Sequence, residues 1–363
     1  MKILLYFGHP SQYLFLRESI RILSADHKIF ILIKTKDVLE DLIKNDGLPY
    51  KNILPRERGR SKVSIILSLI RRNIKILPII LKNRPQLLIS TDASLAQLGW
   101  LLRINRITIT EDDYNVIRHL AKLSYPFTDT ILCPEACDVG KYTQKKVGYK
   151  GYMKLAYLHP NIFKIDSQVK RKYNLSDKFV LIRLSRLSAH HDFGIKGIDG
   201  SMLDSIIALV ESKGFKIFIS AEGSLGKPYQ SYLLDIDPSH MQQVLAHASL
   251  LISDSQSMSV EAAMLGVPSI RYSSFAGKIS VLEELEHKYK LTYGIPTGKG
   301  SLLKEKLNSI LETTDLAAVF QQQRSIMLND KIDVSAFLVW FISNYPDSKK
   351  IMHNNPDFQD KFR

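Results

Sequence analysis

The stretch SDSQSMSVEAAMLGVPSIR, residues 253–271, decides the fold of this chain. The apolar run SLLIS that leads into it predicts a buried strand, and the serines that follow predict the start of a helix. Gly266 and Pro268 predict the end of that helix, and the run VPSIRY predicts the next strand. A strand, a helix and a second strand in this order form the βαβ unit of a parallel sheet.

The same alternation of short apolar runs and helical patterns extends outward through both halves of the chain. Because such units build parallel sheets covered by helices, we expect an α/β protein with two doubly wound, Rossmann-like domains. Ligands bind at the carboxyl ends of the strands in open sheets of this kind, and we expect the two domains to face each other across a cleft. The predicted strands lie at 2–7, 28–34, 87–90, 107–110 and 130–133 in the first half, and at 179–185, 215–220, 249–254 and 267–272 in the second.

The length of 363 residues exceeds what one ordinary hydrophobic core supports, so two domains are expected. We place the first domain at 1–165 and the second at 166–340, because a polar and charged segment separates the two series of strands. The tail at 341–363 is polar and contains two prolines. We expect this tail either to be partly disordered or to cross back onto the first domain.

Net charge and cysteine content limit which classes of binding partner and which cellular compartment are expected. The formal net charge of +14 suits anionic partners such as phosphorylated ligands or acidic lipid surfaces. No nucleic-acid-binding module is recognised, so we expect no nucleic acid. Cys133 and Cys137 are too few for a disulfide framework and lack the second ligand pair of a zinc site, so we expect free thiols and no metal. Without a signal sequence or a bilayer-spanning run, a cytoplasmic protein is expected.

The helix that starts near residue 255 has the features of a phosphate and ribose site. Backbone N–H groups at a helix start, together with serine hydroxyls, bind phosphate, and Glu261 about one turn further on suits two ribose hydroxyls. A capped core helix would carry the same serines, but the complete run through Pro268 favours a nucleotide. The residues expected to hold it are Ser253, Ser255, Gln256, Ser257, Met258, Glu261 and Arg271.

The loop after the strand at 179–185 is a second candidate region. Arg183, Arg186 and Lys196 can neutralise a diphosphate, although a solvated basic loop would look the same. His191 is a further candidate contact, but two adjacent histidines do not easily bind one metal ion. Glu222 closes the strand at 215–220 and is expected to reach the base or the ribose, or else to form a structural ion pair.

In the first half, titratable residues follow three predicted strands. His9 follows the first strand and suits a general base, or a cap of the next helix. Acidic side chains at strand ends suit proton transfer at a sugar, or N-capping, and these are Asp92, Glu111, Asp112 and Asp113. His159 lies near the domain boundary, where it could face the cleft or simply form a turn.

The pattern D-S-x-x-x-x-x-E-A-x-x-L-G-x-P at 254–268 resembles the donor-nucleotide segment of GT-B glycosyltransferases. It also resembles the corresponding segment of the non-hydrolysing UDP-N-acetylglucosamine 2-epimerases. Segments including HPSQYLFLRESIRIL, YPFTDTILCPEA and LIRLSRLSAHHDFGIKGI, in order across residues 3–295, resemble domain of unknown function 354, a bacterial and archaeal family placed among GT-B-like proteins. In this fold the serine region meets the diphosphate and the glutamate meets the ribose.

The resemblance implies a metal-independent, hexosyltransferase-like enzyme that uses a nucleotide-diphosphate sugar, most often a UDP-sugar, as substrate and needs no cofactor. It implies a glycan or lipid-linked acceptor and a role in cell-surface polysaccharide or glycolipid assembly. His9 or an acid near Asp112 would then activate the acceptor. A 2-epimerase with Asp92 and Glu111 as acid and base is the first alternative, and a non-catalytic nucleotide-sugar-binding protein is the second. A homodimer is left open.

A basic, apolar stretch runs from Arg56 to Arg84. Arginines and lysines alternate there with isoleucines and leucines, a composition typical of a helix that lies on an anionic membrane face. A core helix with a solvated charged side would show a similar pattern, and Pro78 interrupts it. We therefore expect association with the inner leaflet of the membrane as one reading of this stretch.

Overall fold

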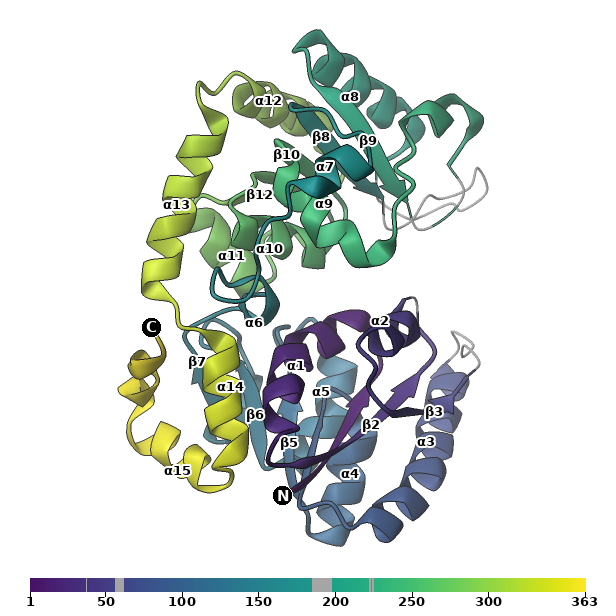
Figure 1. Ribbon diagram of the computed structural model, residues 1–363, viewed down its shortest axis with the longest axis vertical. Coiled ribbons are helices and arrows are strands. Elements are labelled where there is room, and N and C mark those ends of the chain that lie inside the picture. Colours follow the sequence, from purple (N-terminus) through teal and green to yellow (C-terminus); the bar gives the residue numbers. More distant parts are fainter. Residues whose placement is uncertain (37, 56–61, 185–197, 222, 224) are drawn as a thin grey trace. The chain divides into compact units, whose positions relative to one another are not determined.

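The computed structural model describes residues 1–36, 38–55, 62–184, 198–221, 223 and 225–363. The chain forms two compact units (Figure 1). Unit 1 contains Met1–His159 and Lys331–Arg363, and unit 2 contains Pro160–Asp330. The first boundary therefore lies at His159 rather than after residue 165, and residues 331–340 belong to unit 1 rather than to the second domain.

Unit 1 contains a seven-stranded sheet in which every paired strand is parallel, with the order β3-β2-β1-β4-β5-β6-β7. Strands β2 and β3 are added on one side of β1, and β4 then pairs with β1 on its other side. This reversal is the topological switch point at which loops after the strands gather. The strands are β1 (Lys2–Phe7), β2 (Lys28–Lys34), β3 (Tyr50–Leu54), β4 (Leu87–Ser90), β5 (Asn105–Ile109), β6 (Thr130–Pro134) and β7 (Lys146–Tyr149).

Helices of unit 1 pack in two groups. One group consists of α3, α4 and α5, which contact one another in that order, and in the other α1 packs on α6 and α14. The central strands are buried along nearly their whole length, as expected for parallel strands covered on both faces. The helices are α1 (Pro10–Leu23), α2 (Leu39–Asn45), α3 (Lys62–Asn83), α4 (Ala93–Leu102), α5 (Arg118–Ser124), α6 (Leu155–Leu158), α14 (Val334–Ser343) and α15 (Asp347–Asn354), with 3-10 turns η1 (Tyr125–Phe127), η2 (Gly140–Lys145) and η5 (Pro356–Phe362).

The tail crosses back onto unit 1 and is helical rather than disordered. The backbone N–H of Ile332 donates to the carbonyl of Lys150 at 2.9 Å, which fixes the return of the chain beside β7. Phe337 on α14 is fully buried and lies 6.1 Å from the ring of Tyr149. The Lys150 ammonium also pairs with Asp360 at 2.8 Å. The second of the two expectations for the tail therefore holds.

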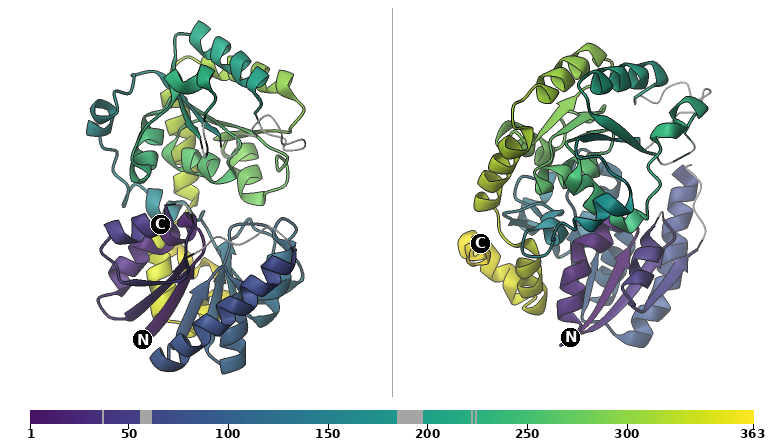
Figure 2. Two further views of the ribbon diagram at one scale, coloured as in Figure 1. Left: turned by 90° about the vertical axis from the view of Figure 1, so that its right-hand side faces the viewer. Right: turned by 45° about the horizontal axis from the view of Figure 1, so that its top comes forward.

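Unit 2 contains a five-stranded parallel sheet with the order β12-β11-β10-β8-β9, seen from two further sides in Figure 2. Its core is formed by β-branched and leucine side chains of the strands, packed against α8 and α12. The predicted class, α/β with two Rossmann-like parallel-sheet domains, is confirmed. The elements are β8 (Phe179–Leu184), β9 (Lys216–Ala221), β10 (Leu250–Ser253), β11 (Ser269–Tyr272), β12 (Thr292–Ile295), α7 (Gln168–Lys172), α8 (Gly200–Ser212), α9 (Met241–His247), α10 (Gln256–Leu265), α11 (Ser280–His287), α12 (Gly300–Leu311), α13 (Leu316–Asp330), η3 (Lys227–Tyr232) and η4 (Pro238–His240).

The stretch at 250–272 forms the predicted strand, helix and strand. Ser255 is the N-cap of α10, and Gly266 ends this helix in the left-handed conformation with a φ of 70°. A Cβ at Gly266 would lie 2.5 Å from Nε2 of Gln321 on α13, and together with the left-handed φ this favours glycine. Within the described part of the chain, no helix combines the length and the apolar character needed to cross a bilayer.

Candidate functional site

A row of polar residues crosses the sheet of unit 2 near the carboxyl ends of its strands. In the strand register, Ser253 of β10 pairs with Arg183 of β8 on one side and with Arg271 of β11 on the other. Arg183 in turn pairs with Ser220 of β9, and its Nη1 donates to the Ser220 hydroxyl at 2.7 Å. Two guanidinium groups therefore flank the strand that leads directly into α10.

The N-terminus of α10 presents several donors just beyond this row. The Ser255 hydroxyl accepts the backbone N–H of Met258 at 3.4 Å, while the Ser255 N–H donates to the Ser253 hydroxyl at 2.8 Å. The N–H groups of Gln256 and Ser257 belong to the first helical turn, where no carbonyl within the helix can accept them. Among the described residues, no partner is found for the Ser257 hydroxyl. These donors, with the helix dipole, form a place for an anionic oxygen.

A buried arginine lies behind this helix start. Arg271 is fully buried and donates from Nη1 to the side-chain oxygen of Gln256 at 3.0 Å. The Gln256 amide donates onward to the hydroxyl of Ser273 at 2.6 Å. Burial lowers the pKa of Arg271, and the carboxylates of Glu286 and Glu283 oppose this shift. Arg271 therefore adds positive potential to the helix start through Gln256, without reaching the surface itself.

Glu261 is a buried carboxylate one and a half turns into α10. Only 5% of its surface is exposed, and the neighbouring positions on the helix are apolar. The amide of Gln242 on α9 donates to its Oε1 at 3.4 Å, which is a long hydrogen bond. A charged group in such surroundings is costly unless it serves a ligand or a structural partner. A carboxylate has acceptor sites enough to receive hydrogen bonds from a pair of vicinal ribose hydroxyls as well.

The other residues predicted for the nucleotide have different positions. Met258 is 8% exposed and packs as a core residue of α10. Arg186, His191, Lys196 and Glu222 lie outside the described residues. Seven of the predicted residues lie around β10 and α10, namely Ser253, Ser255, Gln256, Ser257, Glu261, Arg183 and Arg271.

In unit 1, His9 follows β1 and is the N-cap of α1. Its Nδ1 accepts the backbone N–H of Ser11 at 3.2 Å, so in the neutral imidazole the proton resides on Nε2. The imidazole is exposed, and its basic nitrogen Nδ1 is used in the helix cap. This geometry is that of a helix cap, the second of the two roles predicted for His9. A His9 that caps α1 through Nδ1 can still donate a hydrogen bond from Nε2 to a ligand.

Asp92, after β4, has both carboxylate oxygens occupied. Oδ1 accepts the N–H of Ser94 at 2.8 Å as the N-cap of α4, and Oδ2 lies 3.3 Å from Nη1 of Arg72. Arg72 projects from the inner face of α3, is 5% exposed and also donates to the Ser94 hydroxyl at 3.2 Å. Asp92 therefore joins α3 to α4 at the switch point of the sheet.

The three acids after β5 have three different environments. Glu111 accepts the N–H of Met153 at 2.6 Å and the ammonium of Lys154 at 2.5 Å, in an ion pair that is almost completely buried. Asp113 is 5% exposed and accepts the N–H of Asp138 at 2.7 Å. Both side chains therefore hold the loop after β5 against neighbouring segments of unit 1.

Asp112 lies between them with its side chain exposed, and no hydrogen bond to its carboxylate is found within the described part of the chain. Its backbone N–H donates to the Thr110 hydroxyl at 3.2 Å, which fixes the turn. The pKa of Asp112 is raised, first by loss of solvation in this crowded loop and then by the Glu111 carboxylate, whereas Lys154 acts in the opposite direction. Asp112 is thus the acid of this edge best placed to exchange a proton with a ligand.

Two cations of this site were not singled out from the sequence. Arg72 occurs in a basic run, and only the spacing of Arg72, Ile76 and Ile80 on the buried face of α3 could have separated it from the exposed basic residues. Lys154 is the one charge within YMKLAYL, and a lone lysine in an apolar run signals a buried cation with an acidic partner. His159 follows α6 and its N–H bonds to the carbonyl of Leu155 at 3.2 Å, a position at the end of unit 1.

Within the described ranges, no group of three or more His, Cys, Asp or Glu side chains is arranged to hold a metal ion. The carboxyl edge of unit 1 therefore contains carboxylates held by Arg72 and Lys154, with Asp112 exposed among them. The carboxyl edge of unit 2 contains donors and cations around a buried glutamate. The first arrangement can move protons, and the second can hold a nucleoside diphosphate.

No protein-family model matches the chain, so the resemblance to domain of unknown function 354 is not supported. No curated protein matches the chain in sequence. Solved structures are similar in fold. UDP-GlcNAc 2-epimerase from Neisseria meningitidis, bound to UDP-GlcNAc, has a TM-score of 0.71 at 13% identity over 94% of this chain and 99% of that one. The enzyme from Methanocaldococcus jannaschii, with UDP-GlcNAc and UDP, has a TM-score of 0.64 at 14% identity over 90% and 100%. A glycosyltransferase from Rickettsia africae has a TM-score of 0.58 at 14% identity over 98% and 99%. At these identities the similarity concerns the fold, which is GT-B-like.

Proposed function

We propose that this protein is a GT-B-type glycosyltransferase that binds a UDP-sugar on unit 2 and transfers the sugar to an acceptor hydroxyl. The observation that carries the proposal is the combination of the donor-rich start of α10 with the buried carboxylate of Glu261 on the same helix. The helix start offers N–H donors to a phosphate, and Glu261, about 7.5 Å further along the helix axis from the rise of 1.5 Å per residue, offers a carboxylate to the ribose. UDP is the nucleotide of choice because the structurally similar epimerases are described with UDP or UDP-GlcNAc bound.

The diphosphate site uses neutral donors and fixed positive charge. The N–H groups of Gln256 and Ser257 and the Ser257 hydroxyl contact the phosphate oxygens, and Arg183 supplies charge from the adjacent strand. Arg271 acts through Gln256, because its guanidinium is buried. Charge that grows on the diphosphate as the glycosidic bond breaks is stabilised by these preorganised donors.

Asp112 is the proposed general base. Its carboxylate takes the proton of the acceptor hydroxyl while the acceptor oxygen bonds to the anomeric carbon of the sugar. The bond from that carbon to the diphosphate oxygen breaks at the same time, and UDP leaves with the bonding electron pair. The raised pKa of Asp112 improves it as a base, and His9 Nε2 can donate a hydrogen bond to the sugar or the acceptor.

A 2-epimerase is the second candidate, and the fold similarity to several such enzymes favours it. That reaction removes a proton from a sugar carbon and needs acid and base groups there, for which Asp92 and Glu111 were the sequence candidates. Both carboxylates are held by Arg72, Lys154 and backbone donors, so protonating either one would break an ion pair inside unit 1. This arrangement supports the transferase as the leading proposal.

Two experiments test the proposal in sequence. A thermal-shift screen with UDP, GDP, CMP and TDP-sugars should single out UDP-sugars, since a ligand at about 100 times its dissociation constant adds about 2.7 kcal/mol of stability. UDP release is then measured with and without candidate glycan and lipid-linked acceptors. Release that depends on acceptor supports the transferase. Incorporation of solvent deuterium at C2 of the sugar without an acceptor would instead show that the protein is a 2-epimerase. Tight UDP-sugar binding without either reaction would indicate a non-catalytic binding protein.

A further inference from the structure

Helix α3 has two faces of different character. Arg72, Ile76 and Ile80 are buried and face the core of unit 1. The opposite face carries large aliphatic side chains that remain in solvent. Leu67 is 47% exposed, Ile70 49%, Ile74 66% and Leu81 56%.

These side chains form one continuous feature, the α3 stripe, which consists of Leu67, Ile70, Ile74 and Leu81. The spacings of three, four and seven residues place all of them on one side of the helix, with exposed Pro78 between the last two. The stripe is about 21 Å long, from the rise of 1.5 Å per residue. Four large aliphatic groups in a row are uncommon on a free protein surface and mark an interaction site.

The charge around the α3 stripe has a single sign. Exposed Arg71, Lys75 and Lys82 flank it, and α3 contains neither aspartate nor glutamate. Within the described residues, neither Arg71 nor Lys82 has an acidic partner, so their charge is directed to solvent. The apolar groups and the cations therefore share one face.

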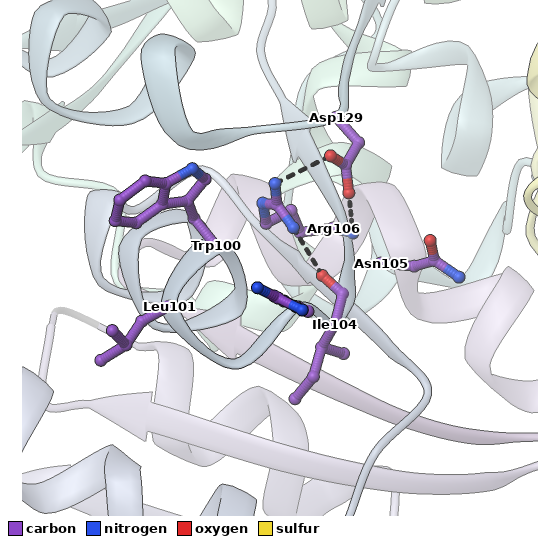
Figure 3. Close-up of a pocket in the computed structure, with 7 residues that line it drawn as sticks. Trp100, Leu101, Ile104, Asn105, Arg106 and Asp129 are labelled. Carbon is purple, nitrogen blue, oxygen red and sulfur yellow. Dashed lines mark hydrogen bonds and ion pairs between the residues drawn. The ribbon is translucent and has the colours of Figure 1, made fainter.

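The neighbouring helix α4 also ends in exposed apolar side chains. Trp100 is 56% exposed and Leu101 63% exposed at the end of α4, and Figure 3 shows both side chains at the rim of a hollow beside Arg106. The Arg106 guanidinium is occupied by Asp129 at 2.8 Å and by the carbonyl of Ile104 at 2.8 Å, so the hollow offers no free cation from this residue. An exposed tryptophan beside aliphatic and cationic groups is typical of a surface that enters a membrane interface.

We infer that α3 docks this protein on an anionic lipid bilayer, with the α3 stripe inserted among the headgroups and Arg71 and Lys82 on the lipid phosphates, while the Lys75 ammonium donates to the carbonyl of Ile53 at 2.8 Å. Charge complementarity selects this occupant. A second copy of the same stripe would place like charges opposite one another, which is unfavourable, whereas an anionic bilayer supplies both an apolar interior and negative headgroups. This inference is independent of UDP-sugar binding on unit 2, so either proposal can fail without the other.

Sedimentation of the full-length protein with vesicles tests this inference. Mixed phosphatidylglycerol and phosphatidylcholine vesicles should bind the protein at about 0.1 M salt, and much less at about 1 M, where charges are screened within about 3 Å. Pure phosphatidylcholine vesicles should bind it weakly. Ile70→Ser with Ile74→Ser should lower the partition coefficient at least about tenfold, and Arg71→Glu with Lys82→Glu roughly 30-fold, from about fivefold per basic residue.

Matched controls alter exposed residues of unit 2. Ile326→Ser removes a 47% exposed isoleucine from α13, and Lys178→Glu with Lys304→Glu reverses two exposed charges. Both controls should retain at least half of the binding, and far-ultraviolet circular dichroism should be the same for all variants. Equal binding to neutral and anionic vesicles, or equal losses in the controls, would overturn the inference. A dimer in analytical ultracentrifugation that dissociates on Ile70→Ser with Ile74→Ser would also overturn it, because a second copy would then cover the stripe.

Discussion

At the carboxyl edge of the five-stranded sheet, Arg183 and the buried Arg271 flank Ser253, and Glu261 is a buried carboxylate of the helix that follows. At the carboxyl edge of the seven-stranded sheet, carboxylates follow β4 and β5, and the cations are buried behind them. The two edges occupy the same position in similar folds, yet unit 2 presents Arg183 and the N–H donors at the start of α10, whereas unit 1 presents the carboxylate of Asp112. A fold of this kind therefore fixes where chemistry occurs, while a few ion pairs decide which chemistry each edge can perform.

The comparison also separates the buried residues that stabilise each edge from the accessible residues that can contact a ligand there. Arg72 and Lys154 neutralise Asp92 and Glu111 inside unit 1, and Asp112 stays exposed between these pairs. In unit 2, Arg271 is the buried member and the helix start at Ser257 is the presented one. Substitutions of the buried residues should therefore mainly lower the free energy of unfolding. Substitutions of the accessible residues should mainly change ligand affinity or turnover.

The largest effect is expected from breaking the buried pair of Lys154 and Glu111. Lys154→Met leaves the Glu111 carboxylate buried without its cation, which should lower the free energy of unfolding by about 3–5 kcal/mol. Urea denaturation of the full chain measures it. Restoring much of that loss with Glu111→Gln in the same chain would show that the unpaired charge is the cause. Exposed Lys122→Met is the matched control, and an equal loss there would contradict the argument.

Replacing the presented acid should affect turnover instead. Asp112→Asn removes the proposed base and should reduce acceptor-dependent UDP release about 10²- to 10⁴-fold, while UDP-sugar affinity and the melting temperature stay close to those of the native chain. Asp26→Asn, an exposed acid of the same unit, should leave the rate unchanged. Full activity in Asp112→Asn would assign the base elsewhere, with Asp92 and Glu111 as the next acids to substitute.

A smaller effect is expected on the nucleotide edge. Glu261→Gln keeps the shape of the side chain but removes its charge, and should weaken UDP binding about 10- to 100-fold in calorimetry, from about 1.5–3 kcal/mol for hydrogen bonds to a charged group. Exposed Glu305→Gln on α12 is the control. UDP affinity that is unchanged in Glu261→Gln would remove the ribose role and leave Glu261 as a structural partner of Gln242.

The sequence allowed the fold to be predicted because local signals repeat along the chain. The run at 250–272 has a strand period, a serine cap and a terminal glycine in order, and each is a local signal that the structure satisfies. Residue spacing also located the edges at which His9, Asp92 and Asp112 lie.

The sequence could not predict which polar residues form hydrogen bonds or ion pairs inside the protein. Arg72 meets Asp92 across 20 residues and Lys154 meets Glu111 across 43, and no local pattern encodes such contacts. Asp92, Glu111 and Asp112 look equivalent as acids after strands, and only the tertiary structure distinguishes them. Gln256 likewise reads as a ligand contact, although its side chain bridges Arg271 and Ser273.

The smallest expected effect is a shift in the pH dependence of the reaction. Asp112 must be deprotonated to act as a base, so turnover should fall as the pH drops through its pKa. Loss of solvation in the crowded loop after β5 and the adjacent Glu111 carboxylate raise that pKa above the ordinary value of 3.8, which moves the acid limb of kcat/KM to higher pH. Lys154 opposes the shift, so Lys154→Met should move the limb further upward in whatever fraction of this variant stays folded. A pH profile of native kcat/KM with its acid limb at or below 3.8 would contradict the assignment of Asp112, because an unperturbed or stabilised carboxylate would then control the rate.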